Sequence, residues 1–144
     1  MGHAFITIRR ECTKHGLPIS HTAVLQAICL ETLSGVFGGL AYETEWNDHR
    51  FVNPETGRRL RFDGYFPSLA LLVEFHGYQH WAFPNIYHET AEKFQAAQYR
   101  DSLKVDLARA DGLKLLVVRE DEPYADPAYL RGRLINEGYL APGK

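Results

Sequence analysis

Two acidic residues, Asp63 and Glu74, stand where a β-hairpin would bring their carboxylates together. The segment 67–70 between them predicts a four-residue turn, because proline favours the start of a turn. Counting outward from this turn, Phe66 faces Leu71 and Asp63 faces Glu74, and such cross-strand partners lie about 4.5–5.5 Å apart. Two carboxylates about 5 Å apart repel by roughly 3 kcal/mol at an effective dielectric constant of about 20. A shared proton, a basic neighbour or a divalent cation must therefore offset the repulsion.

The alternation of side chains along the two strands predicts an apolar face opposite these acids. That face would hold Phe62, Phe66, Leu71, Val73 and Phe75. His76 would share the face of the acids, and His80 follows just beyond it. Carboxylate oxygens suit Mg²⁺ or Mn²⁺ better than zinc. The pattern thus indicates a divalent metal site or, alternatively, an ordinary solvated acidic face.

The remaining chain predicts helices and strands that would build a sheet around this hairpin. We expect helices at 5–16, 21–33, 89–110 and 127–136, and strands at 40–46, 49–52, 58–66, 71–76 and 113–119. This order is typical of an α/β protein with a mixed sheet and helices on its faces. The first two helices, joined at Gly16–Pro18, would form a plain αα-hairpin or a helix-turn-helix-like DNA reader.

The long helix at 89–110 has two candidate faces. The first, which we expect to pack on the sheet, contains Ala96, Tyr99, Leu103, Leu107 and Ala110. The second contains Phe94, Ala97, Asp101, Lys104 and Ala108. Because Asp101 and Lys104 are three residues apart, they would form either a surface ion pair or part of a charged site.

Composition favours one ordinary globular domain. The chain has 144 residues, of which 45% are hydrophobic and 24% charged. We expect a cytoplasmic protein, because no apolar run is long enough to span a bilayer and Cys12 and Cys29 are too few for a disulfide scaffold. The net charge of -2 lacks the positive footprint of a nucleic-acid-binding protein. A metal-dependent nuclease remains compatible with this charge, since its site contains acids and its basic residues are concentrated locally.

Four stretches of the chain match one family pattern. They are Arg61-Phe62-Asp63, the run from Val73 to His80, Arg100-Asp101-Ser102-Leu103-Lys104, and the run from Gly112 to Val118. Together they resemble the PD-(D/E)XK nuclease superfamily, and most closely its Vsr-like branch. That branch includes very-short-patch mismatch-repair endonucleases and some phage homing endonucleases. The resemblance covers residues 40–120, and its most specific part is the Gly-x-Gln-His sequence directly after the second acidic strand.

The resemblance implies a restriction-endonuclease-like fold with a short N-terminal helical pair. Residues 39–120 would form the catalytic core of a single nuclease domain, preceded by a helical segment at 1–38 that contacts DNA and followed by a C-terminal helix and tail at 121–144. It also implies an endonuclease that uses Mg²⁺ or Mn²⁺ and leaves 5′-phosphate and 3′-hydroxyl ends. The partner would be DNA, and a homodimer would supply the two sites that a double-strand break requires.

Site residues follow from the resemblance one position at a time. Asp63 and Glu74 would bind the metal, and Glu31 would complete the site, with Glu43 and Glu45 as alternatives. His76 takes the place of the lysine in the basic family pattern. The general base is therefore left open among His76, His80 and Lys104, with Asp101 beside them. The very-short-patch enzymes hold a structural zinc with cysteines and a histidine. With only Cys12 and Cys29, this chain is expected to lack that zinc site.

DNA contacts would come from cations and aromatic residues around the motif. The expected contacts are Arg9, Arg10, Lys14, Arg58, Arg59, Arg61, Gln79 and Trp81. Trp81, Phe83 and Tyr87 would stack on or wedge between bases, or simply pack in the core.

Two rival functions remain open at this stage. A zinc-dependent hydrolase would use His76 and His80, whose spacing of four residues suits two ligands on one helix, although Gly77 between them argues against a helix. A non-catalytic nucleic-acid-binding module on the nuclease fold is the other. Such a module would be expected to have lost its acids, whereas this chain retains both.

Overall fold

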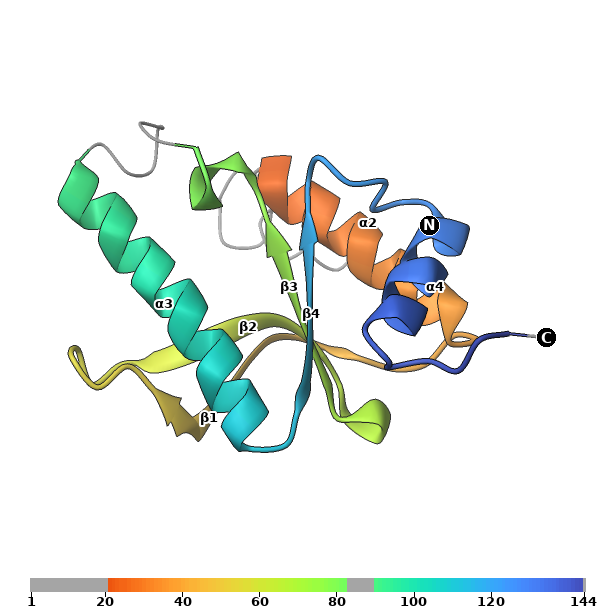
Figure 1. Cartoon of the computed structure of the whole chain (residues 1–144), viewed down its shortest axis with the longest axis horizontal. Coiled ribbons are helices and arrows are strands. Elements are labelled where there is room, and N and C mark those ends of the chain that lie inside the picture. Colours follow the sequence, from red (N-terminus) through yellow and green to blue (C-terminus); the bar gives the residue numbers. More distant parts are fainter. Residues whose placement is uncertain (1–20, 83–89, 144) are drawn as a thin grey trace, which may run out of the picture. The chain divides into compact units, whose positions relative to one another are not determined.

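The protein is described here by a computed structural model covering residues 21–82 and 90–143. It is an α/β protein with a four-stranded sheet in the order β1-β2-β3-β4 (Figure 1), as the sequence predicts. The first two strand pairs are antiparallel, whereas β3 and β4 run in the same direction, so the sheet is mixed. In chain order the elements are α2 (His21–Val36), β1 (Glu43–Val52), β2 (Arg59–Phe66), η1 (Pro67–Leu69), β3 (Leu71–His76), η2 (Tyr78–His80), α3 (Ala91–Ala110), β4 (Lys114–Arg119) and α4 (Pro127–Asn136).

The chain divides into two compact units. One comprises residues 43–117, and the other comprises residues 1–42 and 118–144. Among the described residues, no helix is both long enough and apolar enough to cross a membrane. The helix expected at 5–16 lies outside the described part of the chain.

The hairpin of β2 and β3 has the predicted register. Phe66 pairs with Leu71, and the ladder continues through Tyr65 and Leu72 to Gly64 and Val73. The connection is a single 3₁₀ turn that begins at Pro67 and ends at Ala70, whose φ is 51°. This turn sets the register, so the same count places Asp63 opposite Glu74.

The prediction for Phe62 is wrong, because its ring lies on the side of the sheet that packs against α3. It belongs to one apolar cluster with Phe51, Leu60, Leu72 and Ala108. On the neighbouring strand, Glu45 has a left-handed φ of 52°, between the ladder pairs Thr44–Gly64 and Trp46–Phe62. The alternation of side chains counted from Phe66 does not hold as far as Phe62.

The face of α3 that packs on the sheet combines parts of both candidate stripes. Leu103 and Leu107 of the leucine-containing stripe pack against the apolar cluster, as predicted, whereas Ala96, Tyr99 and Ala110 of that stripe are exposed. Ala97 and Ala108 of the other stripe are buried. The small alanine side chains allow a close approach of helix to sheet. This orientation turns the charged residues of the second stripe inward, where the sheet supplies partners for them.

The ends of α3 follow ordinary capping rules. Thr90 caps the N-terminus through its side-chain oxygen, which accepts a hydrogen bond from the Lys93 backbone N–H at 3.2 Å. The helix ends at Ala110, and Gly112 then adopts a φ of 76°. Glycine adopts this conformation without the steric penalty that a Cβ atom brings.

In the other unit, α2 packs against α4. The buried apolar residues of this pair are Leu25, Ala27, Cys29, Leu30 and Leu33 on α2, and Leu130 and Leu134 on α4. The α4 bounds agree with the prediction, and Asp126 caps this helix by accepting a hydrogen bond from the Ala128 backbone N–H at 3.0 Å. The segments expected as two strands at 40–46 and 49–52 form the single strand β1, and α2 extends to Val36.

A matched pair of glycine substitutions tests these backbone assignments. Gly112→Ala should destabilise the protein by about 1 kcal/mol, because alanine resists the left-handed conformation. Gly132→Ala, inside α4, should stabilise it by about 0.5–1 kcal/mol. Neither new Cβ would meet a neighbouring atom within 4 Å, so only the backbone conformation differs. Urea unfolding measures both values, and effects of the same sign would contradict the assignment.

Candidate functional site

Asp63 and Glu74 are joined by reciprocal hydrogen bonds between their strands. The Asp63 backbone N–H donates to Glu74 Oε2 at 2.9 Å, and the Phe75 backbone N–H donates to Asp63 Oδ2 at 2.7 Å. Each carboxylate is therefore fixed by the backbone of the opposite strand. The predicted pairing of the two acids across the hairpin is present.

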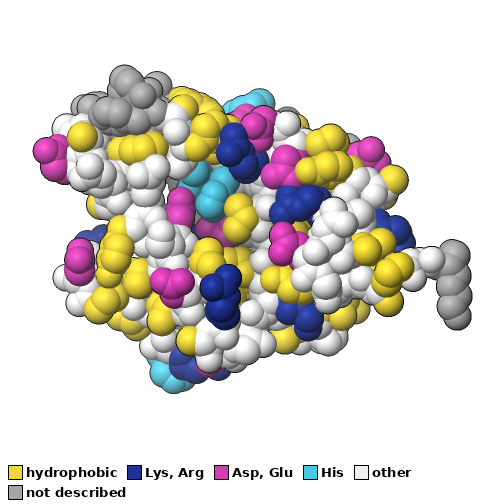
Figure 2. All heavy atoms as spheres, in the orientation of Figure 1, with side chains coloured by type: hydrophobic (Ala, Val, Ile, Leu, Met, Phe, Trp, Pro, Cys, Tyr) yellow, Lys and Arg dark blue, Asp and Glu magenta, His cyan; other side chains and the backbone are white. Residues whose placement is uncertain are grey.

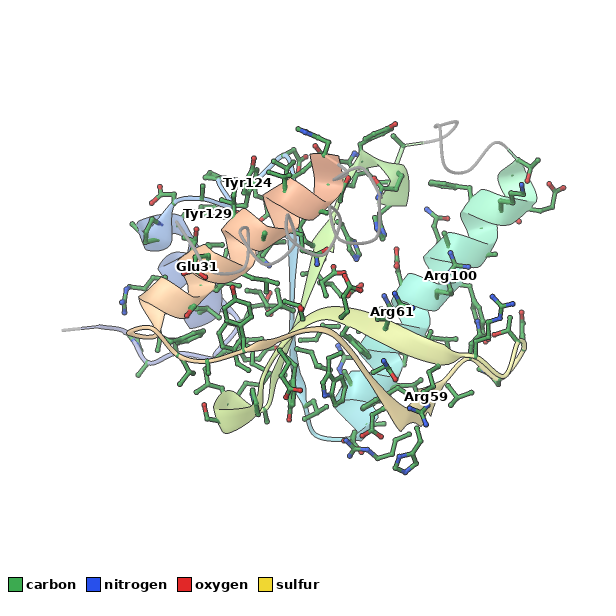
Figure 3. The ribbon with its side chains drawn as sticks, turned by 180° about the vertical axis from the view of Figure 1, so that it is seen from behind. Glu31, Arg59, Arg61, Arg100, Tyr124 and Tyr129 are labelled. Atoms are coloured by element: carbon green, nitrogen blue, oxygen red, sulfur yellow. The ribbon has the colours of Figure 1, made fainter. Side chains whose placement is uncertain are left out.

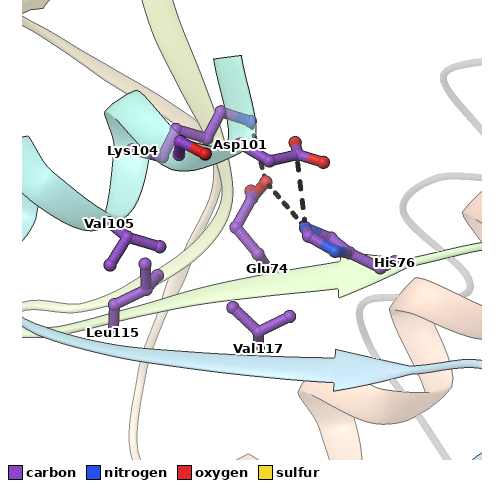
Figure 4. Close-up of a pocket in the computed structure, with 8 residues that line it drawn as sticks. Glu74, His76, Asp101, Lys104, Val105, Leu115 and Val117 are labelled. Atoms are coloured by element: carbon purple, nitrogen blue, oxygen red, sulfur yellow. Dashed lines mark hydrogen bonds and ion pairs between the residues drawn. The ribbon is translucent and has the colours of Figure 1, made fainter. Parts of the chain in front are cut away.

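Helix α3 supplies the basic neighbour that the acid pair requires. Lys104 Nζ donates to Glu74 Oε1 at 2.7 Å (Figure 4), and the two side chains are 15% and 3% exposed. The ammonium group also lies 5.6 Å from the centroid of the Phe62 ring. The alternative of a surface ion pair between Lys104 and Asp101 is wrong, because each of them turns to a partner outside the helix.

Two histidines contact Asp101, and one of them, His76, also contacts Glu74. His80 Nδ1 lies 2.8 Å from Asp101 Oδ2, a hydrogen-bond distance. His76 Nε2 lies 3.8 Å from Glu74 Oε1 and 4.0 Å from Asp101 Oδ1, which are ion-pair distances. The two imidazole rings stack with centroids 4.0 Å apart and an angle of 6° between their planes. As Gly77 indicates, no α-helix forms here: β3 ends at His76, and His80 follows in the short η2 turn.

The two carboxyls divide charge and proton between them. Burial, and next the negative charge of Glu74, raise the pKa of Asp63 well above its usual range. Burial alone would also raise the pKa of Glu74, but His76 and Lys104 outweigh it and lower that pKa. The negative charge of the pair therefore resides on Glu74, and Asp63 is the carboxyl that retains a proton.

Two cavities open beside these residues. The smaller, of about 190 Å³, is lined by Glu74, His76, Asp101, Ser102, Lys104, Val105, Leu115 and Val117 (Figure 4). The larger, of about 370 Å³, is lined by Arg59, Leu60, Arg61, Asp63, His80, Ala97, Arg100, Asp101 and Lys104. Figure 2 shows histidine and acidic side chains gathered in a hollow between α3 and the end of β3. The larger cavity thus combines four cationic side chains with two acids, a composition suited to a phosphate group and a cation.

Six of the predicted site residues lie together in the unit of residues 43–117. They are Asp63, Glu74, His76, His80, Asp101 and Lys104. Of the predicted DNA contacts, Arg59 and Arg61 line the larger cavity, and Arg58 is exposed immediately before β2. Gln79 lies in η2, and Trp81 follows it.

Other predicted residues are not brought to this site by any described contact. Glu31 belongs to α2 in the other unit (Figure 3), where its Oε2 accepts a hydrogen bond from Tyr42 Oη at 2.9 Å. Arg9, Arg10, Lys14, Phe83 and Tyr87 lie outside the described residues. Of the alternatives to Glu31, Glu45 acts on Asp63, because its charge contributes to the raised pKa.

Sequence reasoning did not select Arg100 for the site. Arg100 lines the larger cavity from α3, across from Arg59 and Arg61 on β2 (Figure 3). Its spacing of four residues from Lys104 was the available signal, since residues four apart share one face of a helix.

Comparison with known proteins finds relatives among viral proteins. The chain is 37% identical over 91 residues to "Uncharacterized protein 033L" of Invertebrate iridescent virus 3, covering 62% of the chain and 47% of that protein. It is 32% identical over 131 residues to "Uncharacterized protein 307L" of Invertebrate iridescent virus 6, covering 80% and 64%. It is 35% identical over 68 residues to "Uncharacterized protein 094L" of Frog virus 3, covering 46% and 44%.

The chain therefore spans less than two thirds of the length of each of these relatives. No family model and no solved structure matches the chain.

The raised pKa of Asp63 predicts a stabilising substitution in the site. Below about pH 3.9, the ordinary aspartate pKa, Asp63 is protonated in both the folded and unfolded states and imposes no penalty. As the pH rises above that value, the unfolded chain releases the proton first, so wild-type stability falls. Asp63→Asn removes this term and should stabilise the protein at pH 7–8 by on the order of 1 kcal/mol.

Urea unfolding of both proteins at pH 4 and pH 7.5 measures this difference. The gain should be greater at pH 7.5, because the asparagine oxygen keeps the bond from Phe75 N–H at both values. Asp106→Asn, at an exposed position of α3, is the matched control and should have little effect. A wild type that is more stable than Asp63→Asn at pH 7.5 would contradict the assigned direction of the pKa.

Proposed function

We propose that this protein is a divalent-metal-dependent endonuclease that hydrolyses DNA phosphodiester bonds to 5′-phosphate and 3′-hydroxyl ends. The observation that carries the proposal is the pair of half-buried Asp63 and buried Glu74, held together with Lys104 beside a cavity lined by three arginines. The resemblance to Vsr-like nucleases supplies the reaction type and the choice of DNA. An acid pair with a lysine is suited to this reaction, because phosphoryl transfer requires positioning and stabilisation of negative charge.

The carboxyl pair fits a hard divalent ion such as Mg²⁺ or Mn²⁺. Both donors are carboxyl oxygens, and each carboxylate offers about four acceptor positions, more than the hydrogen bonds within the pair use. Glu74 is the ionised partner, and Asp63 has a proton that a cation would displace. An ion held by Asp63 and Glu74 would polarise the scissile phosphate and lower the pKa of a bound water.

The substrate would be held by arginine contacts to its phosphates. Arg59 and Arg61 extend from β2, and Arg100 extends from α3 on the other side of the larger cavity. Arginine binds phosphate oxygens through two parallel hydrogen bonds, which orient the backbone without reading the base sequence. This local cluster offsets the net charge of -2, which otherwise disfavours DNA binding.

Among the three candidates for general base, we assign the role to His80. Its Nδ1 is held by Asp101, so Nε2 is the nitrogen that accepts the proton, and Asp101 stabilises the imidazolium that results. Lys104 is committed to Glu74, and His76 Nε2 faces Glu74 and Asp101. Lys104 would instead stabilise the charge that develops on the phosphate.

One cleavage experiment distinguishes both rival functions from the proposed nuclease. A zinc hydrolase is favoured by Asp101, which adds a third ligand to His76 and His80, and it would be active with Zn²⁺ alone. A non-catalytic DNA-binding module would shift DNA without cutting it. The retained acid pair argues against the module, because a buried pair of carboxyls is costly without a function.

Cleavage of supercoiled plasmid and of a mismatched duplex, with Mg²⁺, Mn²⁺, Zn²⁺ or EDTA, tests the proposal. We expect cutting with Mg²⁺ or Mn²⁺ and none with EDTA, with loss of at least about 10³-fold in Asp63→Asn. Asp101→Asn should lower kcat by at least about 10²-fold with little change in KM. Cutting that persists in Asp63→Asn, or in EDTA, would overturn the proposal.

A matched pair of arginine variants separates phosphate binding from chemistry. Arg100→Ala should weaken DNA binding. It should also reduce by about 1 the slope of the logarithm of the DNA-binding constant against the logarithm of the salt concentration. Arg109→Ala, at an exposed position in the last turn of the same helix, is the control outside the cavity. Equal effects of the two variants would remove Arg100 from the assigned substrate contacts.

A further inference from the structure

We propose that His76, His80 and Asp101 form a second metal site, which binds a borderline-soft divalent ion of the Zn²⁺ class. Among the described residues, these three form the group of potential metal ligands whose donor atoms all lie within 4.8 Å of one another. They come from the end of β3, from η2 and from α3. All three side chains are half-buried, at 15%, 22% and 20% exposure, so they are accessible to an ion and yet held in place.

The donor set distinguishes this site from the carboxyl pair. Two imidazoles and one carboxylate suit Zn²⁺, which in catalytic and regulatory sites takes three protein ligands and leaves one position open. Asp63 and Glu74 offer only oxygen, which suits Mg²⁺ and Mn²⁺. The chain would therefore present two neighbouring sites with opposite metal preferences.

The charges around Asp101 favour a cation. The partners of Asp101 across from α3 are two imidazoles, which carry a positive charge only when protonated. Lys104, on the same helix, is paired with Glu74, and Glu74 itself lies 3.8 Å from His76. His76 thus lies between two carboxyl groups, and His80 contacts Asp101. A bound cation would neutralise Asp101 without requiring either ring to be protonated.

Only short movements would bring the donors to coordination distance. Tetrahedral zinc with bonds of about 2.0–2.1 Å requires ligand atoms about 3.3 Å apart. His80 Nδ1 and Asp101 Oδ2 are already 2.8 Å apart, and His76 Nε2 is 4.0 Å from the other oxygen of Asp101. The parallel rings must turn away from stacking so that their nitrogens converge. His80 lies in a three-residue turn after Gly77, where a small rotation disturbs no long element.

Occupation of this site would have two consequences. Because its ligands join β3, η2 and α3, the ion would stabilise the folded protein by mass action. It would also take His80 and Asp101, the residues assigned to proton transfer, and so inhibit Mg²⁺-dependent cleavage. This second consequence rests on the proposed function, whereas zinc binding itself does not.

Isothermal titration of the EDTA-treated 144-residue chain with ZnCl₂, in the absence of DNA, tests the site. We expect His76→Gln, His80→Gln and Asp101→Asn each to weaken one zinc-binding event at least tenfold. Excess MgCl₂ should not compete for it. His49→Gln is the matched control, because His49 also lies beside an acid, Asp48, at 3.3 Å, but its side chain is 79% exposed. This variant should bind zinc as the wild type does.

Thermal melting provides the second measurement. Zn²⁺ should raise the melting temperature of wild type and His49→Gln, but not of the three ligand variants, each first shown to have a wild-type circular dichroism spectrum. Unchanged zinc affinity in the ligand variants, or no zinc binding by wild type, would overturn the site. Zinc binding is measured without DNA, so its outcome does not depend on the result of the cleavage assay. Zinc binding by a protein that does not cut DNA would refute only the proposed function. DNA cleavage by a protein that does not bind zinc would refute only this site.

Discussion

The buried ion pair between Lys104 and Glu74 is the interaction on which the site depends. A carboxylate that is 3% exposed needs a cation within hydrogen-bond distance. Lys104 of α3 supplies this cation. The same face of the helix places Asp101, three residues before Lys104, against His80. The same pair lowers the pKa of Glu74 and leaves the proton on Asp63. Removing one partner of such a pair typically costs about 3–5 kcal/mol, whereas an apolar replacement of both can be neutral.

Local sequence signals were sufficient to predict the hairpin and its register. Pro67 specified the turn, and one count from it placed Asp63 opposite Glu74. The bounds of α4 were also predicted, and the structure adds that Asp126 caps this helix. The orientation of α3 could be predicted only in part. Leu103 and Leu107 of the leucine-containing stripe pack on the core as expected, but the partner of Lys104 lies on another element. Periodicity within the helix does not register a tertiary ion pair.

The positions of Phe62 and Arg100 both depend on contacts between elements. Phe62 packs with Leu72 and Ala108 on the α3 side of the sheet, and the pattern of its own strand does not predict this contact. Arg100 reaches the site only because α3 is turned as it is. Six site residues could be predicted by type and by resemblance, but their roles follow from contacts between elements: His80 is held by Asp101, whereas Lys104 is committed to Glu74.

Direct measurement of Mn²⁺ binding by electron paramagnetic resonance tests whether Asp63 and Glu74 form a divalent metal site with Lys104 as its resident cation. We expect binding by wild type and at least tenfold weaker binding, about 1.4 kcal/mol, by Glu74→Gln. Lys104→Met should bind more tightly, because the competing ammonium is gone. The exposed Asp106→Asn is the control, and equal Mn²⁺ affinity of wild type and Glu74→Gln would refute a metal site at this acid pair.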